Sequence, residues 1–237
     1  MINIINNILS SNGYKQIGIE APFNNQAFYL FCLPEESKRE EYFVTIQLQT
    51  QSDAAAQALQ EEKAQELFET ISNSGKVDRP FEKNCTMLIC HEEDRISRQT
   101  ILALEEDQYN FKKNVITYTP HELANLESHL SDSGIEKITN KVINEIINSK
   151  GGRNFLTFKN DHINSKGYYS LILKAALKLP FITYSPQEHQ LTNLNDEIKN
   201  SLDPYQSSIY SQLIESETEW TDDNIHQQVA KIWGELV

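Results

Sequence analysis

The chain has 237 residues, of which 39% are hydrophobic and 23% are charged, and its formal net charge is −13. A chain of this length and composition can bury a core without disulfides or a structural metal, and it is not typical of a disordered protein. The acidic total argues against a protein that binds DNA with its whole surface, because phosphate binding requires a concentrated positive face.

The cysteines and the N-terminus point to a reducing compartment. Cys32, Cys85 and Cys90 form no Cys-x-x-Cys pair, which disfavours a disulfide framework and a zinc ribbon. The first residues lack the basic segment of a signal peptide, and no apolar stretch approaches the ~18 residues that a membrane span requires. We therefore expect a cytoplasmic protein without membrane contact.

The first half of the chain predicts a mixed α/β arrangement. Isoleucine and leucine recur at helical spacing over residues 2–12, and two short apolar runs, 28–33 and 42–49, are typical of strands joined by the polar connection 35–41. The patterns that follow indicate a helix over 53–72, a buried strand over 85–90, a brief helix over 99–106 and a strand over 115–118. The order up to residue 90 is α-β-β-α-β.

Helices dominate the second half. They are expected over residues 120–130, 135–148, 165–178, 187–202, 204–216 and 222–236, with Trp233 in the core. Residues 155–158 are too few to assign. We predict an α+β protein with an α/β domain at 1–119, which carries a small sheet, and a mostly helical domain at 120–237. No Gly/Pro/Ser linker separates them, so we expect the two parts to pack together.

Residues 104–118 concentrate acids, aromatics and a lysine pair without a helical or strand period. Aromatic and cationic side chains side by side are common at interface hot spots, which indicates a docking surface. A second possibility is that the acids pair internally with the lysines and the segment is architectural. The predicted partner-contact residues are Glu105, Glu106, Asp107, Tyr109, Phe111, Lys112, Lys113 and Tyr118.

This segment also resembles a known signature. Glu105-Glu106-Asp107, Phe111-Lys112-Lys113, Val115, Tyr118-Thr119 and Glu122-Leu123 resemble the pattern of middle components of ABC-three-component systems, the Lamassu-type bacterial defence operons. The resemblance implies a non-enzymatic accessory subunit between an SMC-like or Rad50-like ATPase and an effector such as a nuclease. The complex would detect foreign DNA of phages or plasmids, and this subunit would contact DNA indirectly, through the complex.

Enzymatic alternatives rest on two groups of residues. His91, Glu92, Glu93 and Asp94 follow an apolar strand and, with the acids at 105–107, could supply oxygen ligands for Mg²⁺. The alternative is a solvated strand end beside a helix N-terminus, which favours acids. The α-β-β-α-β order also suggests a PD-(D/E)xK nuclease with Glu20 as its first acid.

The nuclease comparison fails at the second strand. There the chain reads Gln47-Leu48-Gln49, and amides supply neither the anionic ligand nor the charged amine that such a site uses. The sequence also lacks the glycine-rich phosphate-binding motifs and the Gly-x-Ser-x-Gly motif. We therefore predict no catalytic residue, no metal site and no cofactor.

A basic stretch lies between two acidic flanks. Residues 136–178 hold eight cationic and three acidic side chains, a net charge of +5, whereas the preceding residues sum to −10 and the following ones to −8. Aromatic residues lie among these lysines, a mixture suited to DNA backbone or to an acidic protein face. The predicted contacts are Lys150, Arg153, Lys159 and Lys166. A stand-alone DNA-binding regulator is thus a further alternative, unless the lysines are scattered over different helix faces.

Overall fold

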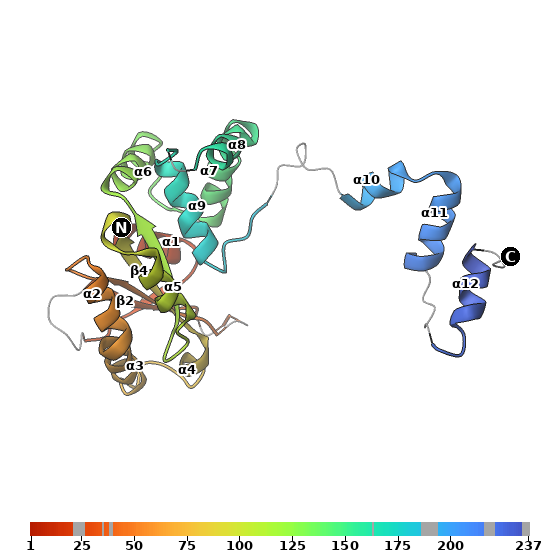
Figure 1. Ribbon diagram of the computed structural model, residues 1–237. Helices are drawn as coiled ribbons and strands as arrows, with labels where there is room; N and C mark the ends of the chain where they lie inside the picture. The colour runs from red at the N-terminus through yellow and green to blue at the C-terminus, as the bar shows by residue number, and fades with distance from the viewer. Residues whose placement is uncertain are drawn as a thin grey trace. The chain divides into compact units, whose positions relative to one another are not determined.

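The computed structural model describes residues 1–20, 27–34, 36–37, 40–162, 164–185, 194–215 and 221–233. The chain divides into two compact units, residues 1–185 and 186–237 (Figure 1). The first unit contains a mixed sheet flanked by helices, and only helices are described in the second. The predicted α+β class is confirmed.

The sheet has five strands in sequence order: β1 (Lys15–Ile17), β2 (Ala27–Cys32), β3 (Tyr42–Gln47), β4 (Cys85–Glu92) and β5 (Lys112–Tyr118). β1, β2 and β3 are antiparallel, and β4 and β5 continue the sheet in parallel with β3. The hairpin predicted for the apolar runs 28–33 and 42–49 is confirmed as the antiparallel pair β2 and β3. β1 was not predicted, because three residues are too few for an alternating pattern. β5 is longer than expected and includes both lysines of the signature.

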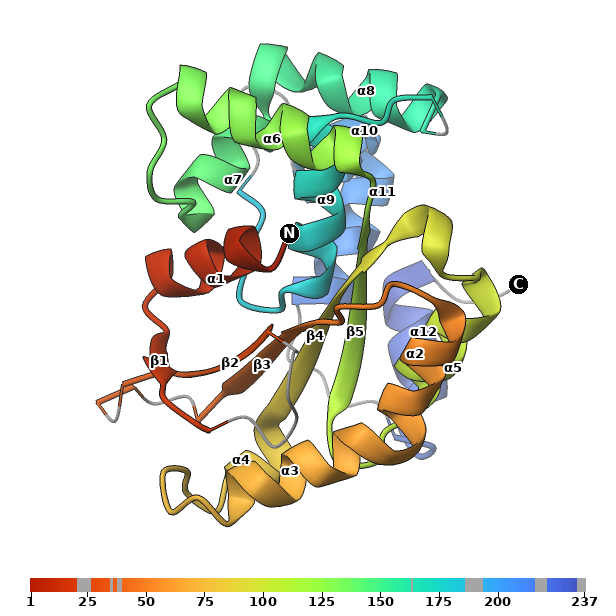
Figure 2. The ribbon, with the colours of Figure 1, turned by 90° about the vertical axis from the view of Figure 1, so that its left-hand side faces the viewer.

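Helices cover both faces of this sheet (Figure 2). On one face lie α1 (Ile2–Ser11), α6 (Pro120–Asp132), α7 (Asn140–Ile147) and α9 (Tyr168–Lys178). On the other lie α2 (Asp53–Ala58), α3 (Ala64–Ser72), the short α4 (Phe81–Asn84) and α5 (Arg98–Glu106). A π-helical turn over Leu59–Lys63 joins α2 to α3, so the helix expected over 53–72 is continuous.

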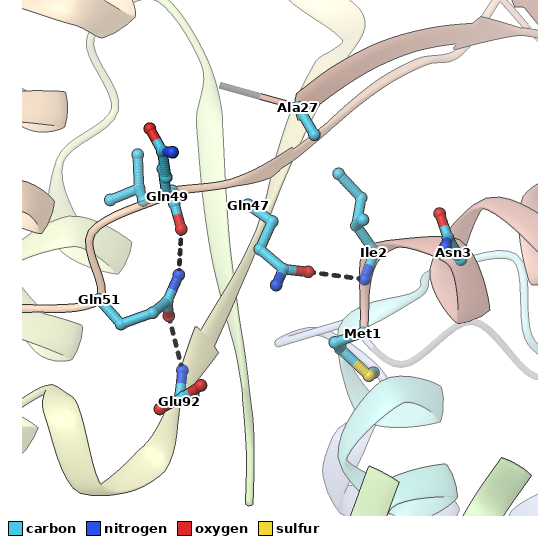
Figure 3. A pocket seen from close by; sticks show the side chains of 9 residues that line it. Met1, Ile2, Asn3, Ala27, Gln47, Gln49, Gln51 and Glu92 are labelled. Carbon is cyan, nitrogen blue, oxygen red and sulfur yellow. Dashed lines mark hydrogen bonds between the residues drawn. The ribbon is translucent and has the colours of Figure 1, made fainter. Parts of the chain in front are cut away.

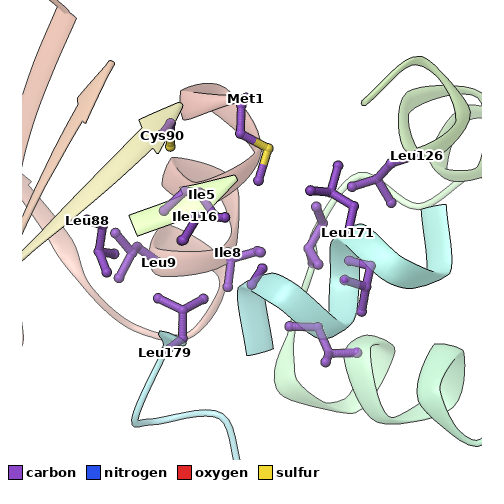
Figure 4. Packing of buried hydrophobic residues seen from close by; sticks show 14 of the residues in the cluster. Met1, Ile5, Ile8, Leu9, Leu88, Cys90, Ile116, Leu126, Leu171 and Leu179 are labelled. Carbon is purple, nitrogen blue, oxygen red and sulfur yellow. The ribbon is translucent and has the colours of Figure 1, made fainter. Parts of the chain in front are cut away.

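The core is divided by the sheet into two layers. Leu88, Cys90 and Ile116 point toward α1 and α9 (Figure 4), whereas Ile89 and Val115 point toward the layer of α2, α3 and α5. Parallel strands buried on both faces are apolar almost continuously, which is the pattern that β4 shows. The domain boundary expected near residue 119 falls at the β5–α6 junction, inside the first unit.

Two helices of the first unit begin later than expected, and one is new. α7 begins after Thr139, whose hydroxyl caps the Val142 N–H at 3.3 Å, and α9 begins after Gly167. α8 (Arg153–Asn160) fills the stretch that was too short to assign. Gly151 and Gly152 precede it with φ of +64° and +77°, a turn that glycine adopts without steric cost.

The second unit contains α10 (Leu194–Ser201), α11 (Pro204–Tyr210), a π-helical turn over Ser211–Glu215, and α12 (Ile225–Trp233). These elements overlap the three helices predicted there. Residues 187–193, 216 and 234–236 of those predictions, and residues 35, 38 and 39 of the predicted connection, lie outside the described residues. Trp233 is 46% exposed, so its assignment to the core was wrong. In the described part of the chain, no helix combines the length and the apolar composition that a bilayer span requires.

Candidate functional site

The loop between α5 and β5 is held by a buried lysine. The side chain of Lys113 is completely buried, and its ammonium donates to Asp107 Oδ2 at 2.9 Å and to the Tyr109 carbonyl at 2.7 Å. The carbonyls of Asp107 and Phe111 lie at 3.3 and 3.4 Å from the same nitrogen. Asp107 also accepts the Tyr109 N–H at 2.9 Å, and Asn110 adopts a φ of +65° at the end of the turn. The lysine thus fixes the path of the loop around itself.

The Asp107 carboxylate is stabilised in its charged form. Partial burial by itself would raise the pKa of Asp107, but the Tyr109 N–H and the Lys113 ammonium outweigh it and lower the pKa below its ordinary value. This pair is the internal acid–lysine contact that the sequence left open as an architectural alternative.

Glu105 protects the open edge of the sheet. β5 is the last strand, so some of its backbone N–H groups have no neighbouring strand. Glu105 Oε1 accepts the Val115 N–H at 2.8 Å, and the same carboxylate pairs with Lys178 at 2.6 Å. Asn114 Nδ2 donates to the Lys178 carbonyl at 3.0 Å. Together these contacts fasten the end of α9 to the edge strand.

Two aromatic residues of the signature are buried rather than available for docking. Phe111 packs edge-to-face against Phe68 at 5.3 Å between ring centroids and is 1% exposed. Tyr118 is 4% exposed, and its hydroxyl accepts a hydrogen bond from Gln47 at 3.1 Å. Burial, together with nearby Glu92 and Cys90, raises the pKa of Tyr118 to about 12. Both side chains belong to the core.

Three of the predicted contact residues remain on the surface. Tyr109 is 82% exposed at the tip of the loop, and Glu106 and Lys112 are exposed on either side of it in the sequence. These three are named here the loop surface. Glu105, Asp107, Phe111 and Lys113 are engaged in contacts of the loop, the edge strand or the core, and Tyr118 is buried at the opposite end of β5. The structure thus separates the eight predicted residues into two groups.

A partly buried ion-pair network joins the sheet to the helices that follow it. Glu122 is 0% exposed and completes a capping box at the start of α6 by accepting the Thr119 N–H at 2.9 Å. Lys174 of α9 donates to both Glu122 oxygens at 3.0 Å and to Glu93 at 2.6 Å. The Ser170 hydroxyl also donates to Glu122. The Thr-x-x-Glu pattern predicts the cap, but no local signal predicts Lys174, which lies 52 residues away.

Glu93 has a second partner in this network. Lys166 pairs with it at 3.0 Å, and hydrogen bonding to Glu93 raises the pKa of Lys166. Burial would raise the pKa of Glu93, but the two lysines outweigh it and lower that pKa below the ordinary value.

The predicted basic contacts are therefore not equivalent. Lys166 is engaged with Glu93, whereas Lys150, Arg153 and Lys159 are exposed and have no ion pair within the described residues. Lys174 and Lys178, from the same basic stretch, are also paired with carboxylates. Only part of the stretch is available to a partner.

An open pocket of about 460 Å³ lies where β3 and β4 end (Figure 3). Gln47 Oε1 accepts the Ile2 N–H at 2.9 Å, and Gln51 Oε1 accepts the Glu92 N–H at 2.9 Å while its amide donates to the Leu48 carbonyl. The described residues that line this pocket are Met1, Ile2, Asn3, Ala27, Gln47, Leu48, Gln49, Gln51 and Glu92. The walls are thus mainly apolar and amide groups, and two of the amides are occupied in holding the strand ends together.

The residues weighed for metal chemistry do not converge. Glu93 turns to its lysine partners, Glu105 turns to Lys178, and Glu20 is exposed. His91 is completely buried, with Nδ1 2.9 Å from the Glu92 carbonyl. Within the described ranges, no group of three or more His, Cys, Asp or Glu side chains is placed to hold a metal ion.

These features define an α+β protein whose signature residues build a supported surface loop at one end of the sheet and an ion-pair network at the other. Residues 41–146 match the family described as ABC-three component (ABC-3C) system Middle Component 1. The match covers β3 to α7 and confirms the resemblance expected from the signature. No curated protein and no solved structure gave a significant match.

Proposed function

We propose that this protein is a non-catalytic accessory subunit of a defence complex. It links an SMC-like or Rad50-like ATPase to a nuclease or other effector and helps to couple the sensing of foreign phage or plasmid DNA to activation of the effector. The match to a middle component supports membership of such a system. In this proposal the contacts run between proteins in the cytoplasm of a bacterium.

The observation that carries this proposal is the loop surface. Tyr109, 82% exposed, projects from a loop that Lys113 and Asp107 hold in one conformation. An exposed aromatic side chain on a preorganised loop loses little conformational entropy on binding, which favours it as an interface anchor. Glu106 and Lys112 beside it supply charges of both signs. We therefore propose that Tyr109 inserts into an apolar pocket of a partner, and that polar groups at the rim of this pocket meet the two charges.

A pull-down tests the proposal. The tagged chain is expressed with its native genomic neighbours, and recovered proteins are identified by mass spectrometry and sized. Recovery of a large coiled-coil ATPase and an effector is expected. Recovery of this chain alone would rule out the accessory role.

Two variants then locate the contact. Tyr109→Ala is expected to weaken partner recovery at least tenfold without changing the unfolding midpoint, because the side chain makes few contacts within its own chain. Tyr205→Ala is the matched control, because Tyr205 is also highly exposed, at 62%, but lies in the second unit. Equal recovery with both variants would place the interface elsewhere.

A metal-dependent nuclease stays the alternative from another class. The pocket at the end of β3 and β4 contains the Glu92 carboxylate. Incubation of the purified chain with DNA in Mg²⁺ or Mn²⁺, with Glu92→Gln as control, tests it directly. Cleavage that the variant abolishes would replace our proposal; absence of cleavage is the expected result.

A further inference from the structure

α8 is a surface helix with a mixed apolar and cationic outer face. No described residue of α8 is buried, and the helix is fastened by Phe158, whose ring lies 6.2 Å from that of Tyr169. Phe155 and Leu156 are 45% and 58% exposed. Helical spacing places Lys159 beside both of them, at i+4 and i+3.

The cations of this face are available to a ligand. Arg153 lies three residues before Leu156 on the same face, and Lys150 lies in the turn that leads into the helix. These cations are exposed and unpaired within the described residues, unlike the lysines that Glu93, Glu105 and Glu122 neutralise. The set Lys150, Arg153, Phe155, Leu156 and Lys159 is named here the α8 surface.

A pocket of about 320 Å³ adjoins the α8 surface, and its described lining contains no carboxylate. Lys150 and Lys166 line it together with Asn154, Thr157 and Asn164. Lys166 is paired with Glu93, and the three polar side chains donate to Ser149, the Arg153 carbonyl and Asp161. By contrast, the pocket at the ends of β3 and β4 includes Glu92. In a chain of net charge −13, a wall that includes the unpaired Lys150 and no described carboxylate favours an anionic ligand.

We propose that the α8 surface binds single-stranded nucleic acid. Lys150, Arg153 and Lys159 contact the phosphates, and Phe155 stacks on a base. An acidic protein would satisfy the cations, but it would not use the exposed aromatic ring beside Lys159 for stacking. The negative charges elsewhere on the chain act weakly at this site, because salt screens exposed charges beyond about 10 Å.

Fluorescence anisotropy of a labelled 20-nucleotide oligothymidine with the full chain tests this proposal. The variant Lys150→Glu/Arg153→Glu/Lys159→Glu is compared with Arg79→Glu/Lys83→Glu/Arg98→Glu, which makes the same change of charge at other exposed positions. We expect the first variant to lose at least tenfold in affinity and the control to lose less than threefold. The slope of log K against log salt should fall by about 0.7 for each phosphate contact removed.

Phe155→Ala isolates the stacking term. We expect this variant to bind the single strand about tenfold more weakly than the wild type, with an unchanged salt slope. We also expect the wild type to bind a duplex more weakly than the single strand, because the bases of a duplex are not open to stacking. Circular dichroism and urea midpoints verify that each variant is folded.

Three results would overturn the proposal. They are no binding at 50 mM salt, equal losses in the two charge variants, or displacement of the oligonucleotide by polyglutamate as readily as by unlabelled oligonucleotide. The last would identify an acidic protein as the ligand. None of these results depends on Tyr109 or on partner recovery, so this inference and the proposed protein contact fail separately.

Discussion

At the scale of single residues, the two adjacent lysines of the signature have opposite environments. Lys112 is exposed, whereas Lys113 is 1% exposed and surrounded by oxygen atoms of its own loop. The alternation of a strand causes this, because neighbouring side chains point to opposite sides. The pair therefore combines a candidate contact with a structural residue.

Substitution of each lysine by methionine separates the two roles. Lys113→Met should lower the free energy of unfolding by about 3 kcal/mol, because it leaves the Asp107 carboxylate and loop carbonyls without their donor. Lys112→Met should change it by less than about 0.5 kcal/mol. Urea denaturation measures both. Similar stability of the two variants would mean that the buried lysine does not hold the loop.

Acid should weaken the same loop. The pKa of Asp107 is lower in the folded chain than its ordinary value of 3.8, so its contribution to stability is present above that value and is lost as the pH falls through the folded pKa. Asp107→Asn should therefore be less stable than the wild type at pH 7, and the difference should shrink on acidification. Unfolding curves from pH 7 to 2.5 measure this, and a difference that grows toward low pH would contradict it.

At the scale of elements, burial in β4 lowers the reactivity of two cysteine thiols. Cys85 and Cys90 lie in this strand at 4% and 0% exposure. Burial raises the pKa of the Cys90 thiol to about 12 and that of Cys85 well above its ordinary value. Because the thiolate is the reactive form, neither cysteine is suited to catalysis or redox exchange in the folded chain.

Alkylation tests this reading of β4. With iodoacetamide at pH 8, we expect Cys32, which is only partly buried, to react first, and Cys85 and Cys90 to react only in denaturant. Mass spectrometry of the peptides reads out each site. Fast labelling of Cys90 under native conditions would show that the strand opens readily.

At the scale of the whole molecule, Lys174 ties the helices after residue 119 to the sheet. It contacts Glu122 at the start of α6 and Glu93 at the end of β4. Several core residues of α1, β4 and β5 meet α9 in the same layer (Figure 4). Removal of everything after residue 119 would expose this layer. The proposed division into domains at 119 is therefore tested by whether residues 1–119 fold without the rest of the chain.

Replacement of Lys174 should weaken the contact between the sheet and the helices that follow residue 119. Lys174→Met should destabilise the chain by about 2–3 kcal/mol, because Glu122 is buried and loses its counter-ion. Lys141→Met is the control, because Lys141 makes an exposed pair with Glu145 at 3.8 Å that is worth at most about 0.5 kcal/mol. Urea denaturation of the two variants makes the comparison. A small effect of Lys174→Met would mean that apolar packing alone holds the two parts together.

Much of the first unit was determined by the sequence alone. The helix expected at 2–12, the hairpin partners and the buried strand expected at 85–90 follow from local patterns of apolar residues. The spacing of Thr119 and Glu122 is a further local signal, for the cap of α6, that the sequence-based predictions did not use. The signature and its resemblance to a middle component were also readable from adjacent residues, since they involve a short segment.

Only the tertiary structure decided which signature residues are free. Glu105 meets Lys178, Glu122 meets Lys174 and Glu93 meets Lys166, over separations of 73, 52 and 73 residues. The sequence counts these charges but does not pair them, because each pairing depends on how α9 packs against the sheet. The physical reason is that local patterns determine which face of an element is apolar, whereas the neighbour that covers that face is chosen by packing of the whole chain.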